Sequence, residues 1–168
     1  MNLTDFKVLT FDVYGTLIDW ETGMVNGLKT LTDKMSRRIT RNEILEAHAH
    51  YESSTQLYTP TKVYSDTLAV VYKRLAEEWG IVVTWSDCLT YGASVKDWPA
   101  FKDSVEALQY LKHHFVLVVL SNIDNTSFVH SNKKLNVVFD AVYTAEDIGS
   151  YKPSQVNFDY MIENLERL

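Results

Sequence analysis

The sequence lacks the features that direct a protein to a membrane, an oxidising compartment or a nucleic acid. Cys88 is the only cysteine, so no internal disulfide can form. No apolar run is long enough to span a bilayer, and the N-terminus lacks the basic and apolar segments of a signal peptide. Lys and Arg number 16 against 22 Asp and Glu, and this net charge of −6 disfavours binding to a nucleic-acid backbone. We therefore expect a cytoplasmic protein with neither a membrane nor a nucleic-acid partner.

What the sequence does contain is enough apolar material for a folded core. Of its 168 residues, 46% are hydrophobic and 23% are charged, which is typical of a folded domain. A chain of this length predicts one domain, or a core domain with a small insertion.

Short apolar runs predict three strands, at residues 8–11, 115–120 and 141–144. The first two runs are unbroken, as in strands that are buried on both faces of a parallel sheet. Asp12 follows the first run, and Ser121 and Asn122 follow the second. Ligands bind at the carboxyl ends of the strands in open α/β sheets, so we expect these polar side chains to meet there.

Helical periodicity occupies the rest of the chain. It predicts a helix at 104–112 and a last helix that starts near Pro153. Two more helices are predicted at 41–57 and 61–79, separated by Pro60. Residues 1–19 and 99–168 thus predict an α/β core, and residues 20–98 predict a helical cap inserted after the first strand.

Three short motifs contain the residues that could carry chemistry. They are Asp12-Val13-Tyr14-Gly15-Thr16-Leu17, then Ser121-Asn122, then Lys152-Pro153. An acidic residue after a buried strand is costly unless it is hydrogen-bonded or functional. Each motif alone has an ordinary explanation, as a strand end, a helix N-cap or a loop dipeptide. Their joint occurrence in this order favours an active site.

These motifs resemble those of the haloacid dehalogenase (HAD) superfamily, in order and in spacing. Further segments are similar to its type II L-2-haloacid dehalogenase branch, namely Asp19-Trp20, Trp98-Pro99 and 144–153. The resemblance covers the whole chain. It implies a Rossmann-like parallel sheet core with an inserted helical cap, and it implies hydrolase activity.

Tyr14 separates the dehalogenase branch from the phosphatases of the superfamily. Those phosphatases usually have an Asp two positions after the nucleophile, where it protonates the leaving alcohol near a Mg²⁺ ion. A phenol with a pKa near ~10 is a poor proton shuttle at neutral pH, and one carboxylate fewer weakens a Mg²⁺ site. Displaced halide needs no proton. A Mg²⁺-dependent phosphatase acting on a small phosphate ester is the alternative, and Tyr14 speaks against it.

The resemblance implies covalent catalysis on a small halogenated carboxylate, without a cofactor. Asp12 would attack the halogen-bearing carbon and expel halide, and water would then hydrolyse the ester formed on Asp12. Lys152 would keep Asp12 ionised and oriented, and Thr16 would assist catalysis. Ser121 and Asn122 would bind the substrate carboxylate, with Tyr14 as a further substrate contact.

The chain departs from this family in two ways. Family members carry a cap arginine that meets the substrate or halide, and none of the insert's arginines stands in a matching context. Members also continue through two more strands and an acidic fourth motif. The strand ending at Asp12 would therefore form an edge of the sheet. We expect a fragment of a longer protein, a second copy covering that edge, or a compromised fold. A homodimer is plausible, and a truncated, non-catalytic interaction module is a third functional hypothesis.

Overall fold

The computed structural model describes residue 2 and residues 5–167. Within this part of the chain a parallel sheet is formed by β1 (Val8–Phe11), β2 (Val116–Ser121) and β3 (Ala141–Thr144). The strand order is β1-β2-β3, with Val8 opposite Val116 and Val118 opposite Ala141. The three strands are parallel, so their last residues lie together at one end of the sheet, which we call its carboxyl edge. These residues are Phe11, Ser121 and Thr144.

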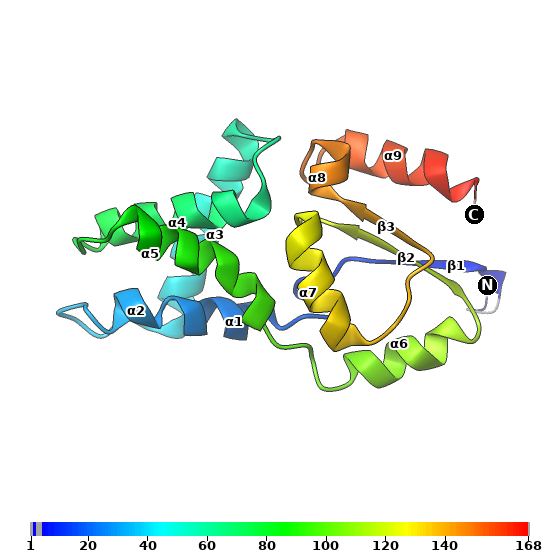
Figure 1. Cartoon of the computed structure of the whole chain (residues 1–168), viewed down its shortest axis with the longest axis horizontal. Helices are drawn as coiled ribbons and strands as arrows, with labels where there is room; N and C mark the ends of the chain where they lie inside the picture. Colours follow the sequence, from blue (N-terminus) through cyan, green and yellow to red (C-terminus); the bar gives the residue numbers. More distant parts are fainter. Residues whose placement is uncertain (1, 3–4, 168) are drawn as a thin grey trace.

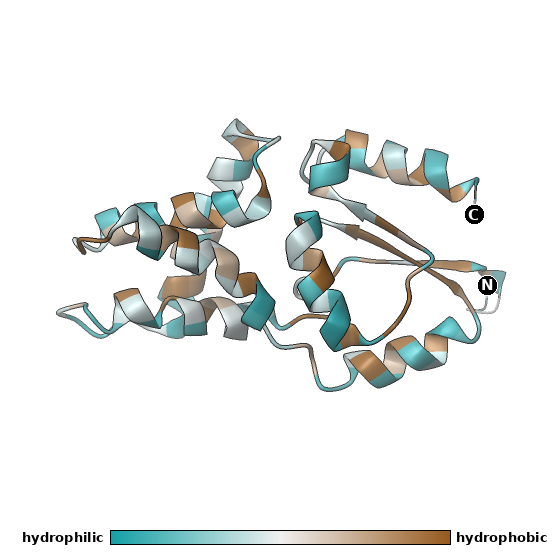
Figure 2. Cartoon of the chain, in the orientation of Figure 1, coloured by the Kyte–Doolittle hydropathy of each residue, from teal (hydrophilic) through white to brown (hydrophobic). Residues whose placement is uncertain are grey.

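The central strand β2 provides the buried middle of the sheet. Its residues 117–121 are buried, which agrees with the unbroken apolar run of the sequence (Figure 2). β1 lies at one side of the sheet, and Thr10 in it is exposed. The prediction that the strand before Asp12 forms an edge is thus confirmed for the described residues.

Helices flank this sheet on both sides. They are α6 (Ser104–Lys112), α7 (Asn125–Leu135), α8 (Ala145–Ile148) and α9 (Gln155–Leu165). Figure 1 shows α9 and α6 on opposite sides of the strands. The predicted helix at 104–112 is confirmed, and the last helix begins shortly after Pro153.

Residues 20–97 form a block of helices beside the sheet, at the end of the molecule away from both termini (Figure 1). Its elements are α1 (Trp20–Gly27), α2 (Lys29–Thr32), α3 (Arg41–Tyr58), α4 (Tyr64–Glu78), α5 (Trp85–Gly92) and the 3₁₀ helix η2 (Ala93–Asp97). A capping box of Thr40 and Glu43 starts α3, and an equivalent pair, Thr84 and Asp87, starts α5. Helix α4 buries Leu68, Val71, Tyr72 and Leu75 as its periodicity predicts.

Polar contacts fix the helical block against the sheet and its flanking helices. The backbone N–H of Ser65, in the first turn of α4, donates to Asp124 Oδ2 at 3.1 Å. The Lys134 ammonium on α7 donates to the carbonyl oxygens of Trp98, at 2.6 Å, and of Lys96. Trp98 itself is 1% exposed at the junction. The block is therefore anchored at both ends of α7, through its N-cap residue Asp124 and through Lys134 in its last turn.

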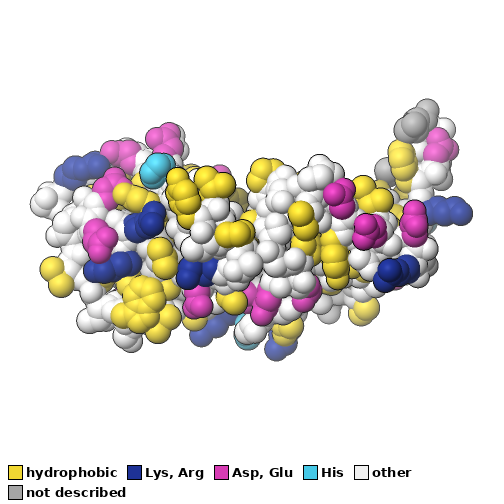
Figure 3. Space-filling model, turned by 90° about the horizontal axis from the view of Figure 1, so that it is seen from above, with side chains coloured by type: hydrophobic (Ala, Val, Ile, Leu, Met, Phe, Trp, Pro, Cys, Tyr) yellow, Lys and Arg dark blue, Asp and Glu magenta, His cyan; other side chains and the backbone are white. Residues whose placement is uncertain are grey.

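The surface carries charges of both signs. On the face seen in Figure 3, acidic, basic and hydrophobic side chains are interspersed. Among the described residues, no helix is both long enough and apolar enough to cross a membrane.

Candidate active site

Asp12 stands directly after β1, at the carboxyl edge of the sheet. The chain then turns sharply, with Gly15 at φ +97° and its N–H donating to the Ile18 carbonyl at 2.9 Å. A Cβ at position 15 would lie 2.8 Å from Trp20 Nε1, so both the backbone angle and the close approach call for glycine. This turn places the Asp12 carboxylate at the carboxyl edge of the sheet and brings Trp20 close to it.

Lys152 pairs with Asp12 across the sheet edge. Its Nζ donates to Asp12 Oδ1 at 2.7 Å and to the Leu120 carbonyl at 2.8 Å. The Lys152 side chain is 19% exposed and that of Asp12 is 41% exposed. The second Asp12 oxygen accepts no bond from a described residue. Asp12 is thus an oriented carboxylate with one side open.

Asn122 holds the loop that carries Lys152. Its Nδ2 donates to the Lys152 carbonyl at 3.0 Å, and its Oδ1 accepts from the Lys152 N–H at 2.7 Å. The side-chain amide is therefore hydrogen-bonded to both the carbonyl oxygen and the N–H of Lys152. Through these two bonds Asn122 positions the lysine, and one N–H and one lone pair of Oδ1 stay available to another molecule.

Ser121 brings an unused hydroxyl to the same place. The residue is 2% exposed, and its buried Oγ has no hydrogen-bond partner in the described structure. An unpaired buried hydroxyl is costly unless something binds to it. Ser121 is therefore ready to bond to a ligand.

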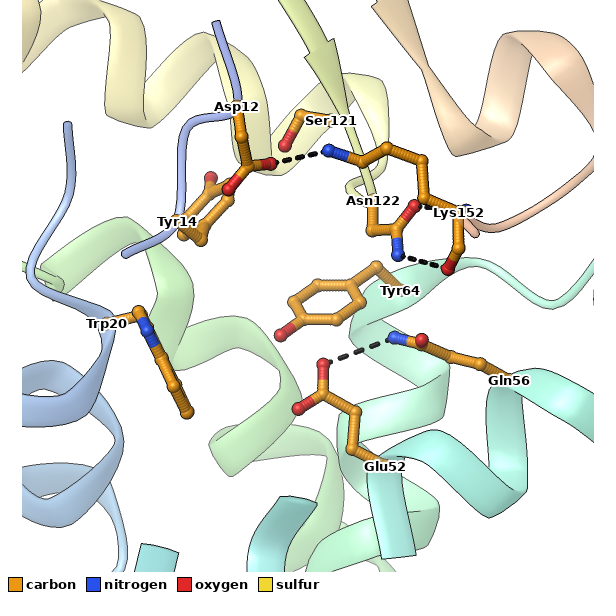
Figure 4. A pocket seen from close by; sticks show the side chains of 9 residues that line it. All are labelled: Asp12, Tyr14, Trp20, Glu52, Gln56, Tyr64, Ser121, Asn122 and Lys152. Carbon is orange, nitrogen blue, oxygen red and sulfur yellow. Dashed lines mark hydrogen bonds and ion pairs between the residues drawn. The ribbon is translucent and has the colours of Figure 1, made fainter. Parts of the chain in front are cut away.

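These groups line a cavity of about 290 Å³, which we call the Asp12 pocket. Figure 4 shows Asp12, Ser121 and Lys152 on one side of it and side chains from α3 on the other. The described lining residues are Asp12, Tyr14, Trp20, Glu52, Gln56, Tyr64, Ser121, Asn122 and Lys152. A cavity of this size accommodates a small molecule.

Tyr14 contributes an aromatic wall. Its hydroxyl shares a hydrogen bond of 2.7 Å with Ser131, and its ring meets Trp98 edge-on with 5.7 Å between ring centroids. Burial raises the pKa of Tyr14 far above its usual range. The phenol therefore stays protonated, which strengthens the argument that it cannot replace the acid of a phosphatase.

The residues of the pocket do not fit Mg²⁺ well. Mg²⁺ takes near-octahedral oxygen ligands, usually with one or two carboxylates. Here the Asp12 carboxylate is bonded to Lys152, and the Tyr14 hydroxyl is bonded to Ser131. Over the described part of the chain, no three His, Cys, Asp or Glu side chains are grouped closely enough to hold a metal ion.

The structure brings together five of the six residues predicted from sequence: Asp12, Tyr14, Ser121, Asn122 and Lys152. Thr16 is different. It is exposed and does not line the Asp12 pocket, because the turn at Gly15 carries it to the surface. Its catalytic role stays a prediction that the pocket geometry does not support.

Four lining residues had no predicted role, namely Trp20, Glu52, Gln56 and Tyr64. Glu52 and Gln56 are four residues apart on α3, a spacing that indicates one polar helix face and is typical of solvent-facing positions. Nothing in the sequence shows that this face is turned toward Asp12. Trp20 belongs to the Asp19-Trp20 segment, whose similarity to the dehalogenase branch was the one available signal.

Comparisons with known proteins identify the family and the fold. The sequence model of a family described as haloacid dehalogenase-like hydrolase matches residues 6–167. A search of curated proteins found no match. Among solved structures, the defluorinating L-2-haloacid dehalogenase Rha0230 has a TM-score of 0.80 at 15% identity, covering 95% of this chain and 69% of that one. The L-2-haloacid dehalogenase PA0810 has a TM-score of 0.78 at 17% identity, covering 96% and 71%.

A third solved structure contains a ligand. It is the L-2-haloacid dehalogenase from Xanthobacter autotrophicus with chloropropionic acid covalently bound, with a TM-score of 0.77 at 16% identity, covering 96% of this chain and 65% of that one. The family match spans nearly the whole chain, and the fold is that of these dehalogenases. The chain therefore belongs to the haloacid dehalogenase-like hydrolase family.

Proposed function

We propose that this hydrolase is of the 2-haloacid dehalogenase type, in which Asp12 displaces halide from a small halogenated molecule. The observation that carries the proposal is the 2.7 Å contact between Lys152 Nζ and Asp12 Oδ1 in a pocket open to solvent on one side. A partly desolvated carboxylate that is oriented by a fixed cation is suited to nucleophilic attack.

The proposed reaction has two steps. In the first, an Asp12 oxygen forms a bond to the halogen-bearing carbon, and the carbon–halogen bond breaks with its electron pair leaving as halide. In the second, water adds to the carbonyl carbon of the resulting ester, and the hydroxylated product leaves with the attacking Asp12 oxygen. One proton is released to solvent, and the carboxylate is restored. No metal ion takes part in either step.

The other groups of the pocket have supporting roles in this proposal. Lys152 orients Asp12 and lowers the cost of its charge, while Asn122 holds the Lys152 backbone in place. Ser121 donates to the substrate, and the Tyr14 ring packs against it. Residues 1–19 and 99–168 would act as the catalytic core, and residues 20–98 as the cap. A homodimer and a cytoplasmic location stay predictions.

Chloride release tests this function. Purified protein should release chloride from at least one of 2-chloropropionate, chloroacetate and 2-chloropropionamide, and EDTA should leave the rate unchanged. Ion-selective or colorimetric chloride detection gives the rate. If no chloride appears from any of the three, and a generic phosphate ester is hydrolysed only when Mg²⁺ is added, the phosphatase alternative replaces this proposal.

A further inference from the structure

The Asp12 pocket contains more negative than positive charge. Its described ionisable lining residues, apart from the tyrosines, are Asp12, Glu52 and Lys152. Lys152 is already bonded to Asp12 at 2.7 Å. The Glu52 carboxylate thus adds a second negative charge to the pocket, and no further Lys or Arg among the described residues lines the pocket to balance it.

Glu52 is held in place by its neighbours. Gln56 Nε2 donates to Glu52 Oε1 at 3.2 Å, one turn further along α3. Tyr64, which is 5% exposed, also lines the pocket, and Figure 4 shows its hydroxyl pointing toward the Glu52 carboxylate. Behind Glu52, the fully buried His48 has its Nδ1 3.3 Å from Oε2. Figure 4 shows the carboxylate facing the pocket from the side opposite Asp12.

The arginines of the helical block are directed elsewhere. Arg37 pairs with Glu43 at 2.9 Å, and Arg41 pairs with Glu21 at 3.0 Å. Arg74 lies over the ring of Tyr51, 5.8 Å from its centroid. None of these side chains, nor that of Arg38, lines the Asp12 pocket. A substrate carboxylate would therefore meet Glu52 without a guanidinium to offset it.

We propose that Glu52 is a specificity-determining residue that selects halogenated substrates bearing a neutral, hydrogen-bond-donating group over halogenated carboxylates. This inference deepens the proposed function and rests on it. An anion brought into a partly desolvated pocket beside a fixed carboxylate is repelled, whereas an amide or alcohol can donate to Glu52. The side-chain hydroxyl of Ser121 accepts or donates and so suits a neutral group equally well.

A matched pair of substrates tests the proposal. 2-Chloropropionate and 2-chloropropionamide have the same reacting carbon and nearly the same shape, and only the first is an anion. The wild-type protein should show a kcat/KM for the amide that is about tenfold or more above that for the acid, because like charges repel strongly where water is partly excluded. Glu52→Gln removes the charge with little change in shape, and it should abolish most of this preference by raising kcat/KM for the acid.

Two further variants separate charge from other effects. Glu46→Gln makes the same change on an exposed part of α3 outside the Asp12 pocket, and it should keep the wild-type preference. Glu52→Asp keeps the negative charge and should therefore keep the preference for the amide. This variant still tests the role of the charge if Glu52→Gln fails to fold. A wild-type preference for the acid, or the same preference in Glu52→Gln as in wild type, would overturn the inference.

Binding measurements decide the case in which no chloride is released. That outcome rejects the proposed function, but the pocket can still be probed with propionamide and propionate by isothermal titration calorimetry. Tighter binding of propionamide to the wild type, lost in Glu52→Gln and kept in Glu46→Gln, supports selection by Glu52. Equal or tighter binding of propionate to the wild type contradicts it.

Discussion

Asp12→Asn should abolish chloride release, with a loss in kcat on the order of a thousandfold or more, as expected when a covalent nucleophile is removed. An amide oxygen is a far weaker nucleophile than a carboxylate. The amide can still accept the hydrogen bond from Lys152, so the pocket keeps its shape. Chloride release over long incubations, at enzyme concentrations high enough to detect the residual rate, gives the measurement.

The variant must be shown to be folded. Asp12 is 41% exposed, and a partly exposed ion pair contributes little to stability, so the free energy of unfolding should change by about 1 kcal/mol or less. Asp103→Asn is the matched control, because Asp103 is exposed and its side chain makes no capping bond to α6. Asp103→Asn should keep full activity. If Asp12→Asn retains a substantial fraction of the wild-type rate, Asp12 is not the nucleophile.

The second large effect concerns stability. Gly92→Ala should lower the free energy of unfolding by about 3 kcal/mol, the upper range for forcing extra atoms into a packed site. A Cβ at position 92 would lie 2.2 Å from the carbonyl oxygen of Ser65, a backbone atom that cannot rotate away. Helices α5 and α4 would have to separate. Since Tyr64 and Ser65 begin α4, the pocket wall and the bond from Ser65 to Asp124 would be disturbed as well.

Thermal unfolding measures this effect, and the melting temperature should fall by about 10 °C in a chain of this size. Gly80→Ala is the control. Gly80 has φ +69°, but nothing lies within 4 Å of an added Cβ. Gly80→Ala should therefore lower the free energy of unfolding through backbone strain alone, by about 1 kcal/mol. A loss in Gly92→Ala no larger than that in Gly80→Ala would show that α5 and α4 do not approach this closely.

Much of the fold follows from local sequence patterns. The apolar runs at 8–11 and 141–144 match β1 and β3, and the run at 115–120 is offset from β2 by one residue at each end. The helix expected at 41–57 is α3, Arg41–Tyr58, because the capping box of Thr40 and Glu43 defines its start. The helix expected from residue 61 starts instead at Tyr64, since Pro60 is followed by a turn. Periodicity does not assign the short helices α1, α2 and α5.

The candidate site was predictable where it depends on strand ends. Asp12 and Ser121 meet because parallel strands bring their carboxyl ends to one edge, and Lys152 reaches them from the loop between α8 and α9. The roles of Thr16 and Asn122 were not predictable to the same degree. The position of the Thr16 side chain depends on the left-handed backbone conformation of Gly15. The side-chain amide of Asn122 is hydrogen-bonded to the backbone of Lys152, 30 residues further along the chain. Such features arise only in the folded chain.

The side of the pocket formed by α3 could not be predicted from the sequence, for the same reason. Glu52 and Gln56 face Asp12 only because α3 packs against α4 and α1 with one particular rotation. A helix rotated by half a turn would present the same polar residues to solvent, with the same sequence. Local patterns define which residues share a helix face, whereas tertiary packing decides what that face meets.

Isotope transfer during a single turnover tests the central claim about Asp12 most directly. The protein, in excess over a halogenated substrate that it turns over, would react in water enriched in ¹⁸O, followed by mass spectrometry of the product and of the peptide that contains Asp12. Attack by Asp12 predicts a first product with ordinary oxygen and one ¹⁸O in that peptide. If the first product carries ¹⁸O and the peptide carries none, water attacks the substrate directly and the account of Asp12 as a covalent nucleophile is contradicted.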